Sequence, residues 1–300
     1  MPDTSTDRSD FDRALAELRP KLHRYCARMT GSVIDGEDVV QDALVKAIEA
    51  LPRTGSVENP EGWLFRIAHN AALDYLRRRT RQAAAHAHED MDMIADPADP
   101  VRDHQIAAAS LRTFMRLPAA QRGIVILTDV LGYSPQEVSD VMGSSIAAVK
   151  SALQRGRMRL RELAQEPDDR PPPALSEPER ARLTTYVERF NARDFDTVRS
   201  MLADDVKLDL VNRLRLSGRT EVGAYFTNYG RVHNWRFVPG FVEGQPAILV
   251  SDPNDASERT KYFILLTWAD DGLVGIRDFL FASYAMDGAE VRRWNDYLPR

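Results

Sequence analysis

The chain has 300 residues, 43% of them hydrophobic and 28% charged, with a formal net charge of −5 at pH 7. This length predicts two or three domains, and the composition is that of a globular protein with enough apolar residues for several cores. The negative net charge excludes a uniformly basic surface, so any contact with nucleic acid must come from local clusters. Cys26 is the only cysteine, which excludes an intramolecular disulfide and a cysteine-based zinc site.

The sequence also limits where the protein can be located and which metals or cofactors it can bind. No apolar run reaches the roughly 18 residues that a membrane-spanning helix needs, and the first ten residues are polar and acidic, unlike a secretory signal. We therefore predict a cytoplasmic protein without membrane contact. His86 and His88 have no third ligand at a suitable spacing, so we expect no metal site and no cofactor.

The first helix is expected to begin at Phe11, after a disordered stretch of residues 1–9 and with Asp10 as its N-cap. Pro20 is expected to divide or kink this helix, because it lacks the backbone donor that a helix interior uses. The Gly-Ser pair at 31–32 is expected to end it.

A second helix is expected from Asp35 to Ile48, where apolar residues recur at helical spacing. This apolar face consists of Val39, Val40, Ala43, Leu44, Ala47 and Ile48. Acidic side chains crowd the first two turns, where the positive end of the helix dipole favours them.

A third helix is expected from Trp63 to Arg81, after a loop from Pro52 to Gly62. It begins with aromatic and aliphatic residues and ends with four arginines. An acidic helix followed by one with a basic end suits a protein that touches a basic protein surface and nucleic acid. We therefore predict a compact helical domain over residues 10–81.

Two long motifs in these helices resemble region 2 of bacterial sigma factors of the extracytoplasmic-function (ECF) branch. They are D-x-E-D-x-x-Q-D, from Asp35 to Asp42, and W-L-x-R-I-A-x-N-x-x-L-D-Y-L-R-R, from Trp63 to Arg78. The resemblance implies that core RNA polymerase is contacted by Asp35, Glu37, Asp38, Gln41 and Asp42. It implies that the −10 promoter element is contacted by Asn59, Trp63, Arg66, Asn70, Arg77, Arg78, Arg79 and Arg81. For Trp63 a position in the core is an equal alternative.

A small, acidic, proline-terminated stretch over residues 82–106 predicts a linker, and a second helical domain is expected over residues 107–165. In this domain the run S-P-Q-E, from Ser134 to Glu137, predicts a capped helix. Gly143 predicts a turn, and a serine after it is expected to cap a second helix. The domain therefore ends in a predicted helix-turn-helix.

The second helix of this pair carries Val149, Leu153 and Leu160 on one face, as a buried stripe requires. Its other faces suit base edges and phosphates, with a solvated basic helix as the alternative. The pattern resembles region 4 of the same family, which recognises the −35 element, although Ala152 stands where the family often has a basic residue. The expected −35 contacts are Ser144, Ser145, Ala147, Lys150, Ser151, Gln154, Arg155 and Arg157.

Three consecutive prolines within residues 166–178 predict a stiff connector. Residues 179–288 then predict helices followed by a run of strands, hence an α+β cone in which one sheet curls around a pocket. The element order, with F-D-x-V-x-x-M-L-A-D-D-V and I-R-D-F, resembles the SnoaL-like branch of the NTF2-like superfamily, which includes enzymes and non-catalytic domains. The predicted fold class is multidomain, with two all-α domains followed by this cone.

Four polar side chains are candidates for the pocket of the cone, namely Asp209, Arg236, Tyr262 and Asp278. A carboxylate in an apolar pocket would have a raised pKa suited to proton abstraction. No His–Asp pair is evident, since His233 is expected at the start of a strand. We therefore favour a structural or ligand-contacting aspartate over a catalytic one.

The motifs together predict an alternative sigma factor, not an enzyme, that binds core RNA polymerase and directs recognition of promoter DNA. Sigma factors with this extension use it for regulation, so the resemblance implies that the cone regulates the chain through a small ligand or an intramolecular contact. Two alternatives stay open. One is a cyclase- or isomerase-like enzyme fused to a DNA-binding module, and the other is a helix-turn-helix regulator that works without core polymerase.

Overall fold

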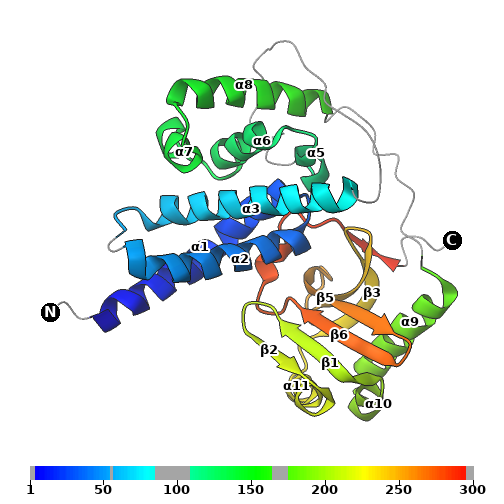
Figure 1. The fold of residues 1–300 in the computed structure, drawn as a ribbon. Helices are drawn as coiled ribbons and strands as arrows, with labels where there is room; N and C mark the ends of the chain where they lie inside the picture. Colours follow the sequence, from blue (N-terminus) through cyan, green and yellow to red (C-terminus); the bar gives the residue numbers. More distant parts are fainter. Residues whose placement is uncertain (1–3, 55–56, 85–108, 164–174, 295–300) are drawn as a thin grey trace. The chain divides into compact units, whose positions relative to one another are not determined.

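The computed structural model describes residues 4–54, 57–84, 109–163 and 175–294. The chain divides into two compact units between Asp168 and Asp169, and each unit is described by itself (Figure 1). His86 and His88, most of the expected linker and the three prolines lie outside the described residues. Among the helices that the structure describes, none has the length and apolar content needed to cross a membrane.

The N-terminal unit begins with three long helices, α1 (Thr4–Thr30), α2 (Val33–Thr54) and α3 (Pro60–Ala84). The expected start at Phe11 is wrong, since α1 begins seven residues earlier and includes Asp10. No glycine or proline interrupts that first stretch, and each added residue gains a helical hydrogen bond. Pro20 lies inside α1 without dividing it, because buried residues such as Leu22 and Tyr25 hold the helix beyond the proline.

The third helix also begins earlier than expected. Asn59 caps α3, and its Oδ1 accepts a hydrogen bond from the Gly62 amide at 2.9 Å. Pro60 takes the first helical position, where a missing donor costs nothing. Pro52, expected in the loop, lies in the last turn of α2.

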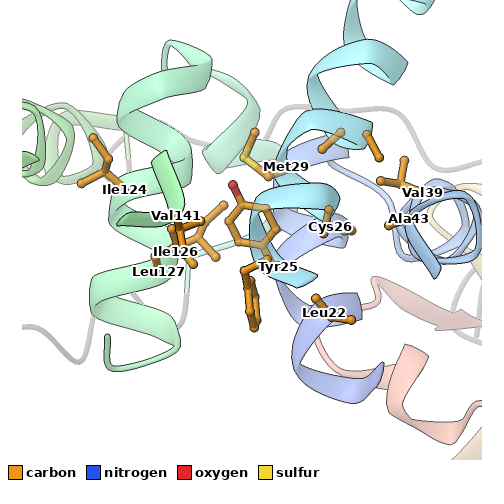
Figure 2. Close-up of a cluster of buried hydrophobic side chains, with 14 of the residues drawn as sticks. Leu22, Tyr25, Cys26, Met29, Val39, Ala43, Ile124, Ile126, Leu127 and Val141 are labelled. Atoms are coloured by element: carbon orange, nitrogen blue, oxygen red, sulfur yellow. The ribbon is translucent and has the colours of Figure 1, made fainter. Parts of the chain in front are cut away.

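Shorter helices follow in the same unit: α5 (Leu111–Met115), α6 (Ala119–Val125), the π-helical turn η1 (Ile126–Val130), α7 (Pro135–Met142) and α8 (Ile146–Leu163). The side chains of α1, α2 and α3 share one core with those of α6 to α8. Figure 2 shows Tyr25 of α1 facing Ile126 and Val141 across this core. Phe65 of α3 joins the two groups of helices, since its ring lies 5.8 Å from Tyr25 and 5.2 Å from Tyr133.

One member of the expected apolar face of α2 points to solvent. Ile48 is 48% exposed and Val45 is 44% exposed, while the other five expected residues are buried. Ile48 was therefore wrongly placed in the core. At 100° per residue, Ile48 lies only about 20° from the buried Glu37 around α2, so helical periodicity does not separate the two residues. The difference comes from the packing at the two ends of the helix.

The C-terminal unit contains α9 (Glu177–Asn191), α10 (Phe195–Ser200) and α11 (Arg219–Arg231) with one seven-stranded sheet. The strands are β1 (Leu202–Leu210), β2 (Leu214–Ser217), β3 (Arg236–Val242), β4 (Gln245–Ser251), β5 (Thr260–Ala269), β6 (Gly272–Asp278) and β7 (Val291–Arg293). Their order is β2-β1-β6-β5-β4-β3-β7, and only β1 and β6 pair in parallel. The predicted α+β class is confirmed.

The strands differ from the sequence prediction in two places. No strand was predicted at β2, which pairs with β1 through a turn in which Asn212 has a positive φ of 63°. The sequence pattern from Leu273 to Tyr284 predicts one strand, but β6 ends at Asp278, and the 3₁₀ helix η2 (Ser283–Met286) follows. The Asp278 carboxylate accepts the Leu280 N–H at 2.8 Å, which turns the backbone out of the ladder.

An aromatic cluster forms the core between α9, α11 and the sheet. The Phe190 ring stacks on Phe237 at 4.1 Å and meets the rings of Tyr229 and Trp235 at 5.2 Å each. Asn191 ties α9 to β3, donating to the Phe237 carbonyl and accepting its amide at 2.9 and 3.0 Å. This packing holds α11 beside the end of β6, where Asp278 lies.

Candidate functional site

The predicted helix-turn-helix is present in α7 and α8. Ser134 and Glu137 form a complete capping box at the start of α7, with Pro135 at the first helical position. Gly143 ends α7 in the left-handed conformation, with a φ of 62°, which costs glycine nothing. Ser145 caps α8, because its Oγ accepts the Ala148 amide at 3.2 Å.

The expected −35 residues lie on the outer side of α8, with one exception. Val149, Leu153 and Leu160 are buried as predicted. The exposed residues are Ser144, Ser145, Ala147, Lys150, Ser151, Gln154 and Arg155. Arg157 instead forms a two-bond ion pair with the buried carboxylate of Asp129, at 3.0 and 2.5 Å. We therefore correct its assignment: Arg157 ties α8 to η1.

Ala152 has a structural reason for its small size. It is 8% exposed and belongs to the buried side of α8. A basic side chain there would have to leave this packed surface or bury its charge. The departure from the family pattern at this position is therefore compatible with the packing of this chain.

Glu37 does not belong to the exposed acidic face of α2. It is 1% exposed and pairs with the guanidinium of Arg19, which also donates to Gln41 Oε1 at 2.9 Å. A carboxylate held in this way cannot face a partner surface, so the expected polymerase contact by Glu37 is corrected to a link between α1 and α2. Gln41 keeps an exposed position.

The remaining acidic residues of α2 lie beside the basic end of α3. Arg79 pairs with Asp35 at 3.2 Å, and Arg78 pairs with Asp42 at 3.7 Å. Asp38, exposed on the same helix, completes the acidic face. These pairs are partly or fully exposed, and such pairs contribute little stability, so other partners can replace them.

The other two arginines at the end of α3 are exposed as well. Arg77 pairs with Asp74 at 3.2 Å, and the Arg81 Nε donates to the Arg77 carbonyl. The acidic and basic surfaces that the sequence predicted are therefore adjacent.

The start of α3 lines a cleft of about 230 Å³. Asn59, Trp63 and Arg66 lie on one wall. Trp63 is half-buried with its side chain packed against the core, which supports the core alternative in part, and its contact with the −10 element stays a prediction. Asn70 is exposed one turn further along α3. The other wall comes from Tyr133 and α7, and includes Glu137 and Asp140.

In the C-terminal unit, Asp278 lies in a hydrogen-bonded cluster with Tyr225, Tyr229 and Tyr262. Asp278 is fully buried, and its Oδ2 accepts hydrogen bonds from Tyr225 at 2.5 Å and Tyr229 at 2.8 Å. The hydroxyls of Tyr229 and Tyr262 lie 3.1 Å apart. Burial raises the pKa of Asp278 to about 6, against the opposing effect of the two tyrosine bonds and the Leu280 N–H.

Asp209 and Arg236 do not reach this ring, so their assignment to the pocket is wrong. Asp209 lies opposite Arg277 in the register of β1 and β6, and Asp278 lies opposite the next residue. Because successive side chains of a strand point to opposite faces, Asp209 faces away from Asp278. It pairs with Arg215 and Arg277 at 3.2 and 3.4 Å. Arg236 is exposed at the first position of β3.

Sequence reasoning missed several residues. Tyr225 and Tyr229 lie one helical turn apart on α11, which was a usable signal for a shared face. Ile146 is 39% exposed at the first position of α8, between the predicted base-contacting residues. Tyr133 donates a hydrogen bond to Glu61 across the cleft, and no local sequence pattern predicts that contact.

The comparisons with known proteins agree with the geometry of the N-terminal unit. The family model described as Sigma-70 region 2 matches residues 15–82, and the one described as Sigma-70, region 4 matches residues 111–160. The ECF RNA polymerase sigma factor SigM of Mycobacterium tuberculosis is 33% identical over 157 residues, which are 52% of this chain and 78% of SigM. The chain therefore belongs to the ECF family of RNA polymerase sigma factors.

Two further proteins are similar to this chain. SigG of Mycobacterium tuberculosis, an ECF RNA polymerase sigma factor, is 31% identical over 214 residues, which cover 63% of this chain and 58% of SigG. The chain thus matches less than two thirds of that relative's length. The alignment with the crystal structure of the Mycobacterium tuberculosis extracytoplasmic function sigma factor SigJ covers 89% of this chain and 95% of the SigJ chain, at 20% identity and a TM-score of 0.35.

Proposed function

We propose that the chain is an alternative sigma factor that binds core RNA polymerase and directs it to promoters with defined −10 and −35 elements. The observation that carries this proposal is the presence, in one unit, of a helix-turn-helix with an exposed polar face and of an α2–α3 pair with adjacent acidic and basic surfaces. Sigma-factor work needs both, because one protein must touch a polymerase and DNA at once.

Each surface has a separate part in this function. The polymerase contacts the exposed face of α2 through Asp35, Asp38, Gln41 and Asp42. The −10 element binds at the start and the basic end of α3, where unstacked bases fit beside Trp63 and phosphates meet arginines. The −35 element binds the outer face of α8, where lysine and arginine hold phosphates and short side chains reach base edges. The polymerase supplies all catalysis.

The C-terminal unit is proposed to regulate this activity. Its Asp278 has a donor for each carboxylate oxygen, which supports a structural or ligand-contacting role over proton transfer. A regulatory unit needs only to change its interactions when its signal arrives, and a buried ionisable group ringed by tyrosines is sensitive to such a change. The cytoplasmic location that the sequence predicts stays a prediction.

Transcription by reconstituted enzyme tests the proposal. The purified chain is mixed with core polymerase and a library of random promoter-length DNA, and transcripts are selected and sequenced. We expect co-purification with core polymerase and a shared pair of DNA elements upstream of the start sites. A chain that never associates with core polymerase, yet binds duplex DNA, would instead be an independent helix-turn-helix regulator.

Two variants test the roles of the basic end of α3 and of the C-terminal unit. Replacing Arg77, Arg78 and Arg79 by alanine should abolish most promoter opening while leaving association with core polymerase intact. A chain that ends before Pro171 should transcribe at a different level from the full chain, since the regulatory unit is gone. Equal transcription by the truncated and full chains would remove the regulatory role and leave the sigma activity standing.

A further inference from the structure

One large apolar side chain is exposed on the helix that we assign to the −35 element. Ile146, the first residue of α8, is 39% exposed. The structure describes every residue of α8, and no other large hydrophobic side chain of this helix is exposed. Among the described residues, Ile146 is not one of the side chains that form the core of the N-terminal unit or pack against it. It is therefore available for contact with a ligand.

Helix geometry places Ile146 in line with two of the expected DNA contacts. Residues four positions apart lie only about 40° apart around a helix and are neighbours on its surface. Lys150 and Gln154 follow Ile146 at this spacing, and both are exposed. Ile146 is therefore the first residue of the row along α8 that faces DNA in the proposed function.

The position of Ile146 in the helix-turn-helix also matters. The first turn of a recognition helix is the part that reaches base edges in the major groove. An isoleucine side chain cannot hydrogen-bond to a base, so its contact there must be apolar. Of the four bases, thymine alone carries a methyl group in the major groove. Ala147, exposed beside Ile146, extends only one carbon from the backbone and leaves room for this contact.

The polar side chains near Ile146 do not distinguish thymine from the other bases. A hydroxyl can donate and accept, so a serine pairs with more than one base. The Ser145 oxygen already accepts the Ala148 amide, and the Ser151 oxygen accepts a hydrogen bond from the Arg155 guanidinium at 2.7 Å. Selectivity for thymine at this turn must therefore come from the apolar side chain.

We propose that Ile146 contacts the methyl group of a thymine in the −35 element and thereby sets the preference for that base opposite the first turn of α8. This inference rests on the proposed function and deepens it. The contact removes apolar surface from water on both partners, which the other three bases do not offer. Phosphate contacts by Lys150 and Arg155 strengthen binding without selecting that base.

Replacement of thymine by uracil isolates the methyl group, because uracil keeps the hydrogen-bonding atoms of thymine and lacks only the methyl. Holoenzyme assembled from core polymerase and the full chain first selects its −35 element from random duplex DNA. Each thymine of that element, on either strand, is then replaced singly, and binding is measured by fluorescence anisotropy. We expect one position at which the loss of the methyl weakens binding about three- to fivefold, as burial of one such group predicts.

Three variants connect this methyl effect to the side chain. Ile146→Ala should remove the difference between thymine and uracil at that position, and Ile146→Val should keep most of it, since valine retains a branched apolar side chain. Lys150→Ala is the matched control from the same row of α8. It should weaken binding to both DNAs by the same factor. Circular dichroism checks that the helices are retained, as expected for a change at an exposed position to a good helix former.

Several outcomes would overturn the inference. They are a selected element without an A·T pair, a full set of uracil replacements without effect, and a methyl effect of unchanged size in Ile146→Ala. Weaker binding by Ile146→Ala with the thymine-to-uracil ratio intact would show that Ile146 contacts something other than this methyl group.

The proposed function can fail separately. If the chain does not associate with core polymerase, the full chain alone selects its duplex and the same ratio is measured. A methyl effect that Ile146→Ala removes would then support the base contact while the sigma activity fails. A chain that binds no duplex DNA in either setting would overturn both.

Discussion

Each of the two units buries a carboxylate among its described residues, and two of these carboxylates are held by different means. Glu37, between α1 and α2, faces the guanidinium of Arg19, whereas Asp278, at the end of β6, faces the neutral hydroxyls of Tyr225 and Tyr229. A cation offsets the charge that burial makes costly, but a hydroxyl only solvates it. The N-terminal unit therefore holds this carboxylate in an ion pair, while in the C-terminal unit burial raises the pKa of Asp278 to about 6.

This difference matches the work that we propose for each unit. In the N-terminal unit, some charges are paired inside, as with Arg157 and Asp129, and many others lie on exposed faces. In the C-terminal unit the buried acid is surrounded by groups that respond to its charge. A binding platform needs constant geometry, and a regulatory unit needs a group with two states.

The largest effect is expected from breaking the buried ion pair. Arg19→Met leaves Glu37 buried without its cation and should destabilise the N-terminal unit by about 3–5 kcal/mol. Chemical denaturation followed by circular dichroism at 222 nm measures this loss. The double variant Arg19→Met with Glu37→Met should recover most of it, because two apolar side chains of similar length need no partner. Equal losses in the single and double variants would show that the charge is not what matters here.

The second effect is a pH dependence confined to the C-terminal unit. The folded pKa of Asp278, about 6, lies above its ordinary value of 3.8, so the folded state binds the proton more tightly than the unfolded state. The stabilisation is complete below about pH 4 and is lost as pH rises towards 6. A shift of about two units corresponds to about 3 kcal/mol in all.

Urea unfolding between pH 4 and 7.5, followed by tryptophan fluorescence, measures this slope, since three of the four tryptophans lie in the C-terminal unit. Asp278→Asn keeps an acceptor for the tyrosine hydroxyls but cannot ionise, so the dependence between pH 4 and 6 should disappear. If the variant shows a pH dependence of unfolding free energy of the same size, that dependence belongs to another ionisable group.

A third prediction separates an exposed cation of α8 from a paired one. Arg155→Ala should weaken duplex DNA binding and reduce the slope of log K against log salt by about 0.9, as expected for one lost phosphate contact. Arg157→Ala is the matched control, since it removes the same charge from the same helix. It should lower stability by orphaning Asp129 and change the salt slope less. Equal changes of the salt slope in both variants would show that Arg157 contacts a phosphate as Arg155 does.

The smallest effect concerns the capping boxes, which occur in both units. Ser134→Ala removes the cap of α7 and should cost about 1 kcal/mol in the N-terminal unit. Ser176→Ala removes the equivalent cap of α9 and should change only the C-terminal transition. Differential scanning calorimetry of the full chain measures both. A single shared transition that moves in both variants would show that the two units unfold together.

Local chemistry made much of the site predictable. The helix-turn-helix follows from a capping box, a glycine and the spacing of apolar residues, all of which act within a few residues of each other. The exposed faces of α2, α3 and α8 follow from helical periodicity in the same way. Where residues failed their assignment, as with Glu37 and Arg157, the cause was a partner many positions away, Arg19 or Asp129.

The sequence by itself determined the class of each unit, the helix-turn-helix and the family to which the chain belongs, because these depend on short-range patterns. Only the tertiary structure decided which carboxylates are buried, that Tyr225 and Tyr229 enclose Asp278, and that α7 covers the start of α3. Those facts come from contacts between residues 18 to 74 positions apart, as with Arg19 and Glu37 or Arg66 and Asp140. Such contacts are set by how whole helices and sheets pack, and no local pattern of residues encodes them.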